Sequence, residues 1–282
     1  MSNVTIVTDS SAYLPRQYVE QYQIPVVPLT LHWEGESYRD GVDIQADEFY
    51  TRLSQSTTLP TTSQVTVGYF LELFKPLLDA GRDVIYLGIS KGISATYDSA
   101  IQASRELGDP ANLVIVDTQL VSMALSLLVL EVARAAEAGA DLAQCKALAE
   151  ATLPKIGVFF TVDTLEYLHR GGRINSAKRL LGSALNLKPI MEIRDGKIEL
   201  VESVISRKKA INRMLDLVEK GVNGRTPVRL APFHALCVDD MEAMVKIAEE
   251  RFHPLEVIRS EVSPVVGSHV GPGTLAIAYM AG

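Results

Sequence analysis

The segment Leu59–Gln64 reads Leu-Pro-Thr-Thr-Ser-Gln and places three consecutive hydroxyl side chains before a stretch with helical periodicity. Pro60 disfavours a helix through the segment itself, because its ring fixes φ and restricts the residue before it. Hydroxyls and free backbone N–H groups at the start of a helix can bind an anion. The same residue types are ordinary helix caps, so this segment by itself leaves an anion site and a plain cap open.

A second hydroxyl-rich loop follows an apolar stretch that ends near residue 89. Residues Gly88–Gly92 have the Gly-x-Ser-x-Gly spacing of a nucleophile elbow, which would expose Ser90 at the top of a sheet. Asp239 with His253 or His269 could complete a catalytic triad in the required chain order. The loop continues past residue 92 instead of entering a helix directly, which argues against an elbow. An α/β serine hydrolase therefore stays open as the alternative function.

The same loop also suits binding. Ser94 and Thr96 stand at the start of the next expected helix, and two hydroxyl-bearing helix starts at one sheet edge would lie where open α/β sheets bind ligands. Hydroxyls can hold a carboxylate in place without neutralising it. His269 lies in the stretch Ser263–Ala278, whose glycines and prolines predict a tightly shaped loop. It is therefore a candidate anion contact as well as a candidate structural histidine.

Composition excludes several kinds of site. Cys145 and Cys237 have neither metal nor redox spacing, and Walker, dinucleotide and calcium-loop motifs are missing, so we expect no metal and no cofactor. The net charge of −7 argues against nucleic acid as a partner. No apolar run reaches transmembrane length, and the N-terminus lacks a cleavage signal, which predicts a cytoplasmic protein.

Positive charge is concentrated in one part of the chain. Between Thr161 and Arg225 there are 13 Lys/Arg and 8 Asp/Glu residues, a local net charge of +5. This excess represents either ordinary solvated helix faces or a docking surface for an acidic partner or for an anionic substrate that the partner holds.

Alternating strand and helix signals in the first half predict parallel strands joined by right-handed crossovers. Expected strands include Val4–Val7, Ile24–His32, Val84–Ile89 and Leu113–Asp117, and expected helices include Ile44–Leu53 capped by Asp43, Leu120–Ala138 and Leu142–Thr152. From residue 156 the pattern changes, and Asp195-Gly196 predicts a hairpin between Lys188–Arg194 and Lys197–Val204. At 282 residues we expect two domains. These are an N-terminal parallel-sheet α/β domain over 1–155 and a second α/β (α+β) domain over 156–282 that contains the antiparallel hairpin.

Six stretches together resemble the DegV family, and they occur in the family's order: Thr8–Pro15, Pro60–Gln64, Ile89–Tyr97, Phe160–Leu168, Gly171–Ile174 and His269–Gly273. That family is similar to the fatty-acid-binding subunits of bacterial fatty acid kinase. The resemblance implies a two-domain α/β protein that buries one long-chain fatty acid between its domains. In the kinase system a separate ATP-binding subunit converts the acyl carboxylate into an acyl phosphate.

Carried over by position, the resemblance implies that Thr62 and Ser94 contact the carboxylate. Ser63 and His269 would be neighbours in the same polar pocket. The resemblance also implies a basic surface for kinase docking or phosphoryl transfer, made of Arg170, Arg173 and Arg207.

This sequence departs from the family pattern at two places. Ala95 stands where glycine is usual, and Val65-Thr66 where Pro-Ser is common. Alanine requires an ordinary φ, so we expect a slightly different loop geometry at that position. Candidate walls for the acyl chain are Leu120–Leu130 and Leu180–Leu187, for which plain core packing is the alternative.

The sequence thus leaves three functions from different classes as alternatives. The first is a lipid-binding protein without catalysis of its own, which holds palmitate, oleate or a similar acid in a buried interdomain tunnel. The second is the serine hydrolase that would use Ser90. The third is a subunit that binds a small polar ketone, since the family's fold is shared with dihydroxyacetone kinases. We take fatty acid binding as the prediction.

Overall fold

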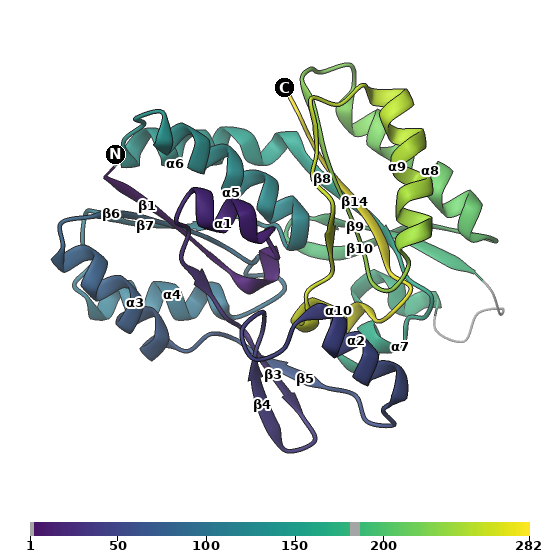
Figure 1. Cartoon of the computed structure of the whole chain (residues 1–282), viewed down its shortest axis with the longest axis horizontal. Coiled ribbons are helices and arrows are strands. Elements are labelled where there is room, and N and C mark those ends of the chain that lie inside the picture. The colour runs from purple at the N-terminus through teal and green to yellow at the C-terminus, as the bar shows by residue number, and fades with distance from the viewer. Residues whose placement is uncertain (1–2, 181–186) are drawn as a thin grey trace.

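The computed structural model describes residues 3–180 and 187–282, which form three β-sheets and the helices that cover them (Figure 1). The first sheet is parallel, with strand order β2-β1-β6-β7. Short apolar runs suit such a sheet because helices cover both of its faces. Its strands are β1 (Val4–Asp9), β2 (Val26–Val27), β6 (Asp83–Gly88) and β7 (Leu113–Asp117).

Helices α3 and α4 lie on one side of this sheet, and α5 and α6 lie on the other (Figure 1). The helices of this half are α1 (Arg16–Gln21), α3 (Val67–Asp79), α4 (Thr96–Glu106), α5 (Ser122–Glu137) and α6 (Leu142–Thr152), with 3₁₀ turns at Ser10–Ala12 and Leu153–Lys155.

Helix α5 is buried over most of its length because it packs between two sheets. It contacts β1 and β6 on one side and β8, β11 and β14 of the second sheet on the other. Residues 123–130 of α5 are buried on every side, which requires such a position.

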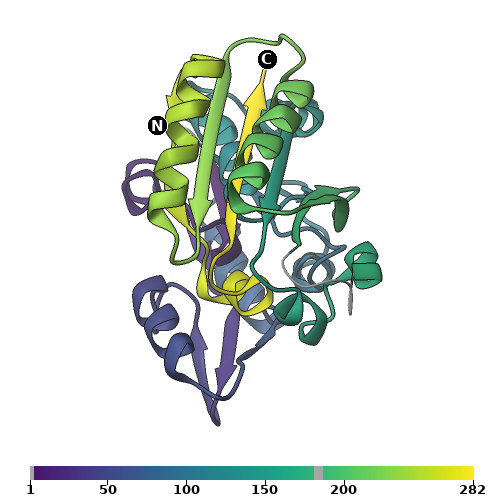
Figure 2. The same ribbon diagram turned by 90° about the vertical axis from the view of Figure 1, so that its right-hand side faces the viewer.

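The second sheet is mixed, with strand order β10-β9-β8-β14-β11-β12, and β13 also pairs with β11. Helices α8 (Arg207–Val222) and α9 (Val238–Phe252) cover the face away from α5, and Figure 2 looks onto that side. The strands are β8 (Ile156–Thr161), β9 (Lys188–Arg194), β10 (Lys197–Val204), β11 (Val228–His234), β12 (Glu256–Val257), β13 (Ser260–Glu261) and β14 (Leu275–Ala281).

A small antiparallel sheet, in the order β4-β3-β5, stands apart from the two larger sheets. Helix α10 contacts β3, β5, α2 and α7, so it connects this sheet to the second half of the chain. The elements are β3 (Thr30–Trp33), β4 (Glu36–Arg39), β5 (Thr61–Ser63), α2 (Ala46–Gln55), α7 (Glu166–Arg170), α10 (Pro264–Val270) and a 3₁₀ turn at Asn175–Leu180.

The helix expected after Leu59–Gln64 is present as α3, but the hydroxyls of Thr61–Ser63 do not lie at its start. Residues Thr61–Ser63 form β5, which pairs with β3, and the N-cap of α3 is Thr66, whose side chain accepts a hydrogen bond from the Tyr69 N–H. The long-range pairing with β3 satisfies the backbone groups that the prediction had left free for an anion.

Three other local expectations are corrected. The single strand expected over Ile24–His32 is divided between β2 and β3, which belong to different sheets. Asp43 does not cap α2, because its carboxylate accepts hydrogen bonds from Arg39, and α2 begins at residue 46. The loop expected around His269 contains α10, which Ser263 caps through the Val266 N–H.

The α/β fold class with a parallel sheet and an antiparallel hairpin is confirmed. The domain boundary at residues 155 and 156 stays a prediction. Within residues 3–180 and 187–282, no helix combines the length and apolar character needed to cross a membrane.

Candidate functional site

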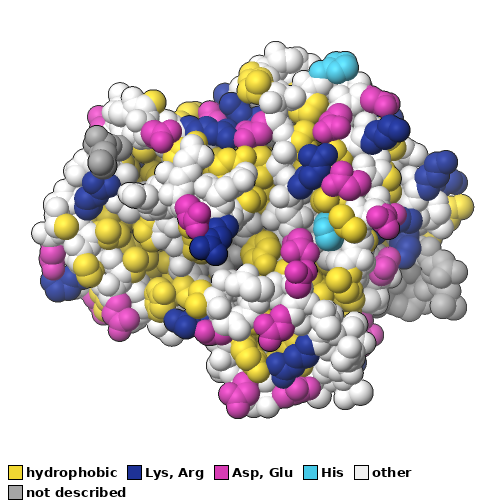
Figure 3. Space-filling view, viewed as in Figure 1, with side chains coloured by type: hydrophobic (Ala, Val, Ile, Leu, Met, Phe, Trp, Pro, Cys, Tyr) yellow, Lys and Arg dark blue, Asp and Glu magenta, His cyan; other side chains and the backbone are white. Residues whose placement is uncertain are grey.

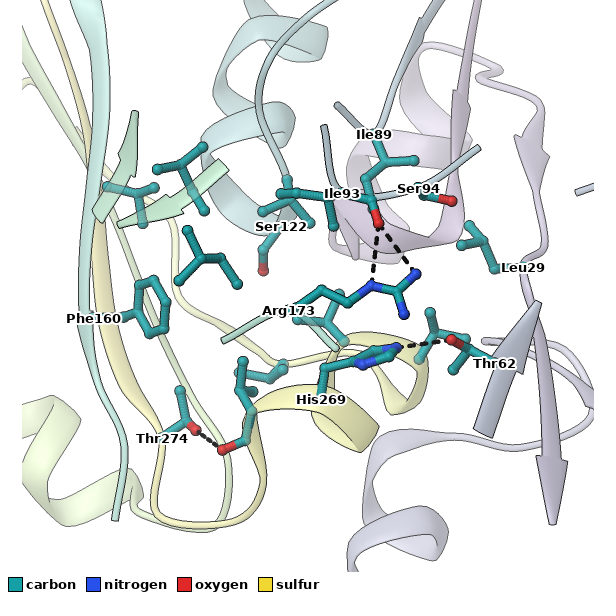
Figure 4. Close-up of a pocket in the computed structure, with 18 of the residues that line it drawn as sticks. Leu29, Thr62, Ile89, Ile93, Ser94, Ser122, Phe160, Arg173, His269 and Thr274 are labelled. Atoms are coloured by element: carbon teal, nitrogen blue, oxygen red, sulfur yellow. Dashed lines mark hydrogen bonds between the residues drawn. The ribbon is translucent and has the colours of Figure 1, made fainter. Parts of the chain in front are cut away.

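A cavity lies between the two halves of the chain and has an empty volume of about 1000 Å³, including its opening to solvent (Figure 4). Most of its wall is aliphatic or aromatic, and both halves contribute to it. The apolar lining comprises Leu29, Ile89, Ile93, Ala95, Val121, Val158, Phe160, Ile193, Ile198, Phe233, Val262, Val265, Val266 and Val270.

Thr62, Ser94, Arg173 and His269 lie towards one end of the cavity, which we call the polar end, whereas Thr274 lies towards Phe160 and Ser122 lies in between (Figure 4). The Thr62 hydroxyl and His269 Nε2 share a hydrogen bond of 2.8 Å, although β5 and α10 are far apart in sequence. Burial lowers the pKa of His269 to about 4, with a further contribution from the positive charge of Arg173. His269 is therefore neutral near pH 7, and hydroxyl and imidazole dipoles dominate this side of the polar end.

Gly171 closes the other side of the His269 ring. His269 Nδ1 is buried and has no hydrogen-bond partner in the described part of the chain. A Cβ on Gly171 would overlap Nδ1, so only glycine allows the ring to occupy this position.

Ser94 enters the polar end from the loop between β6 and α4. Its hydroxyl lies 3.0 Å from that of Thr96, which in turn accepts a 3.3 Å hydrogen bond from the Val65 N–H. These bonds connect the Ser94 loop to the segment that follows Thr62. Ala95 has an ordinary φ of −74°, so the alanine is accommodated without backbone strain.

Arg173 lines the cavity. The prediction had instead placed it on a docking surface. Its guanidinium donates to the Ile93 carbonyl at 3.3 Å from both Nε and Nη2, and to the Gly171 carbonyl at 2.6 Å (Figure 4). Backbone carbonyls satisfy these donors without cancelling the charge. Arg173 is thus the formal positive charge among the residues that line the cavity.

Ser63 lies next to Thr62 but its hydroxyl is directed elsewhere. Successive side chains of a strand point to opposite faces. The Ser63 hydroxyl accordingly shares a 2.9 Å hydrogen bond with His32 Nε2, whose Nδ1 bonds to Ser37 at 2.8 Å. Ser63 lines the cavity, but its hydroxyl is already paired on the other face of the small sheet.

The other two predicted arginines do not join Arg173. Arg170 is exposed and forms a 2.6 Å ion pair with Glu166 one turn earlier in α7. Arg207 lies in a separate depression, where it donates to Asp240 at 2.7 Å and to the Cys237 sulfur at 3.0 Å.

Ser90 does not form the triad that the elbow motif suggested. Its side chain is fully buried, and its hydroxyl donates to the Gly196 carbonyl at 2.8 Å. The proposed partners Asp239 and His253 are exposed at opposite ends of α9, and His269 bonds to Thr62.

The predicted walls of the cavity fit only in part. Of the stretch Leu120–Leu130, the residues at the cavity are Val121 and Ser122, whereas most of the others belong to the core. Residues 181–186 of the second predicted wall lie outside the described residues. The prediction missed Val158 and Phe160, two positions apart on β8, although this period-two spacing places both on one face.

Comparisons with known proteins agree with this architecture. The chain matches the family model described as uncharacterised protein, DegV family, over residues 3–282. A DegV domain-containing protein of Listeria monocytogenes is 36% identical over 277 residues, which cover 98% of each chain. Protein DegV of Bacillus subtilis is 32% identical over 279 residues, 98% of this chain and 99% of its own.

Solved structures of the family superpose over the whole chain. A DegV family protein from Thermus thermophilus, described by its fatty acid binding, has a TM-score of 0.93 at 31% identity, with 100% of both chains covered. DegV of Bacillus subtilis, described as a fatty acid binding protein, has a TM-score of 0.88 at 31% identity, again with 100% of both chains covered. A stearic acid-binding protein from Eubacterium ventriosum has a TM-score of 0.91 at 27% identity and covers 99% and 98%. With its sequence match and its two-part α/β architecture, this chain belongs to the DegV family.

Proposed function

We propose that this protein binds one long-chain fatty acid, such as palmitate or oleate, in the cavity between its halves. The observation that carries the proposal is a mainly apolar cavity with Thr62, Ser94, Arg173 and His269 gathered towards one end. This distribution matches a ligand with one polar head and an apolar chain. The fatty acid binding described for the solved relatives supports the same ligand class.

The carboxylate would lie at the polar end. Thr62 and Ser94 offer hydroxyl donors, and neutral His269 orients Thr62 through their shared hydrogen bond. Arg173 supplies the positive charge that favours an ionised head group, since charge-assisted hydrogen bonds are stronger than neutral ones. Ser63 would contribute through its place in the wall, because its hydroxyl is paired with His32.

The apolar wall would supply most of the affinity. An acyl chain of about 14 methylenes gains about 11 kcal/mol gross on leaving water, at about 0.8 kcal/mol each. The loss of translational and rotational freedom offsets a large share of this gain. The polar end therefore needs only to orient the head group.

We also propose that the protein presents this carboxylate to a separate ATP-dependent fatty acid kinase subunit and performs no catalysis itself. Exposed Arg170 is a candidate docking contact. When loaded protein, kinase subunit and ATP are mixed, hydroxylamine should trap the acyl phosphate as a hydroxamate. Arg170→Ala should reduce the yield while the protein retains its lipid, and an unchanged yield would argue against Arg170 as a docking contact.

The ligand is tested directly by denaturing purified protein and identifying released lipids by mass spectrometry. We expect one long-chain fatty acid per protein molecule, and uptake of added palmitate or oleate by delipidated protein. Absence of both bound acid and uptake would overturn the proposal. Covalent labelling of Ser90 by a fluorophosphonate would instead support the hydrolase alternative.

A further inference from the structure

One buried hydrogen bond outside the polar end joins the two halves of the chain. Ser90 lies two residues after β6 of the first sheet, and its hydroxyl donates to the carbonyl of Gly196 at 2.8 Å. Gly196 belongs to the turn of the β9–β10 hairpin in the second sheet. The same hydroxyl oxygen accepts a 3.1 Å hydrogen bond from the Gly92 N–H, which fixes its orientation.

The tip of this hairpin extends beyond the rest of its sheet. Strand β9 pairs with β8 only from Ile190 to Glu192, whereas the pairing of β9 with β10 continues to the turn. Ile193 and Ile198 form a cross-strand pair in the unsupported part, and both line the cavity. The position of this part of the wall therefore depends on what the tip contacts outside its own sheet.

The tip and the Ser90 loop fit closely. Asp195 and Gly196 have φ values of +51° and +73°, as in the two-residue turns that suit hairpins. A Cβ on Gly92 would overlap the Gly196 carbonyl, and a Cβ on Gly196 would overlap the Ser90 hydroxyl. Glycine on both sides of the contact thus allows the hydrogen bond to form.

We propose that Ser90 is a positioning residue for the acyl cavity. Its hydroxyl fastens the hairpin tip to the first half, so that Ile193 and Ile198 close the cavity around the acyl chain. Release of this bond frees the tip and opens a route for exchange of the ligand. The inference rests on the proposed function, and it gives the Gly-x-Ser-x-Gly motif a structural role in place of a nucleophilic one.

Ser90→Ala removes the donor and tests the proposal. Protein loaded with the fluorescent polyene cis-parinaric acid is chased with excess oleate, and the loss of fluorescence gives the dissociation rate. We expect release about fivefold faster than from the wild type, the factor that one buried neutral hydrogen bond typically contributes. In ligand-free protein, amide hydrogen exchange over residues 193–198 should also become faster.

Ser126→Ala is the matched control. Ser126 is fully buried and donates to the Ala12 carbonyl at 2.8 Å, but this bond does not involve the hairpin. We expect neither faster release nor faster exchange at residues 193–198 in this variant. Equal effects of the two substitutions would overturn the proposal. So would a Ser90→Ala variant in which both ligand release and amide exchange over residues 193–198 are unchanged.

A second variant covers the case in which Ser90→Ala does not fold. Gly196→Ala places a methyl group against the Ser90 hydroxyl in a backbone region that disfavours side chains, so it should also speed both release and hairpin exchange. Normal kinetics in this variant would contradict the proposal. Failure of the wild type to take up cis-parinaric acid or oleate would refute the proposed function, whereas hairpin exchange in ligand-free protein tests the Ser90 contact separately.

Discussion

Single residues at the polar end offer a carboxylate different kinds of contact. Thr62 and Ser94 are hydroxyl donors, Arg173 carries the charge, and His269 is an uncharged ring held between Thr62 and Gly171. A neutral histidine neither attracts the head group strongly nor releases it within the physiological pH range. The hydroxyls and the guanidinium should therefore account for most of the head-group contribution.

Thr62→Ala tests the central hydroxyl. The substitution removes the hydroxyl that would donate to the ligand carboxylate and that bonds to His269. The affinity for oleate should therefore fall about tenfold. Titration of delipidated protein by calorimetry gives the dissociation constant. Thr61→Ala is the control, because Thr61 is the exposed neighbour on β5 and faces the opposite side of the strand. Similar losses in both variants would argue against a direct contact from Thr62.

His269 should make the stability of delipidated protein depend on pH. Its pKa is about 4 in the folded protein and 6.5 in the unfolded chain, so the unfolded state binds the proton more tightly. The resulting stabilisation is fully present above pH 6.5 and is lost as pH falls towards 4, by about 3 kcal/mol.

Urea denaturation at pH 7.5 and pH 4.5 measures this effect. His269→Gln should lack this contribution, so its stability at pH 7.5 relative to pH 4.5 should be lower than that of the wild type by most of this amount. His253→Gln, at the exposed end of α9, should retain it. A wild-type pH dependence that survives in His269→Gln would contradict the assignment.

At the scale of elements, Asp40 joins the small sheet to α10. It follows β4, is buried, and accepts a 3.3 Å hydrogen bond from the Val265 N–H in the first turn of α10. Burial raises the pKa of Asp40 to about 7, and hydrogen bonds from Ser10 and Ser263 oppose this rise only in part. The same helix carries His269, so this contact helps to place the polar end.

Asp40 should act on stability with the opposite sign to His269. A carboxyl whose pKa is raised on folding favours the folded state when protonated, so its contribution is lost as pH rises from about 4 to 7, by about 4 kcal/mol. The free energy of unfolding of Asp40→Asn minus that of the wild type should therefore be larger at pH 8 than at pH 4.5. Denaturant titrations at both pH values measure this difference. Asp47→Asn, on the exposed first turn of α2, serves as the control. If the stability of wild type and Asp40→Asn changed identically with pH, the Asp40 carboxyl would not be the source of this pH dependence.

Elements with strong local signals could be predicted from the sequence. Strand Leu113–Asp117 and helix Leu142–Thr152 have the expected bounds, and Asp195-Gly196 fixes the predicted hairpin because its turn sets the register. A buried strand between polar loops and a helix with a capping box are recognisable without tertiary information.

Features of the site that depend on distant partners could not be predicted in this way. Thr61–Ser63 became a strand because it pairs with β3, thirty residues earlier. The resemblance implied a docking or phosphoryl-transfer surface for Arg173, but its guanidinium donates to two backbone carbonyls beside the cavity. Which residues form the polar end was thus indicated by the resemblance to the DegV family, whereas their contacts required the fold.

At the scale of the whole molecule, opposite surface charges on the two halves do not account for their association. On the face shown in Figure 3, basic and acidic side chains are interspersed. The halves are instead connected by apolar packing, because one core cluster contains residues of both sheets and of α5 between them.

This shared core predicts that both halves unfold together. Trp33, the single tryptophan, lies in β3 of the small sheet and is buried against Phe49, so its fluorescence reports on the first half. Far-ultraviolet circular dichroism reports on all helices. The two urea transitions should coincide within error. Clearly separated midpoints would show that the halves unfold independently.

The position of α5 also has a consequence during synthesis. One face of this helix is covered by β14, which lies at the centre of the second sheet although it is the last strand in sequence order. A nascent chain that has not reached Ala281 therefore leaves the apolar face of α5 without its cover and the second sheet without its middle strand. Such a chain should be a substrate for chaperones on the ribosome, and the cavity between the halves can form only after β14 has been made.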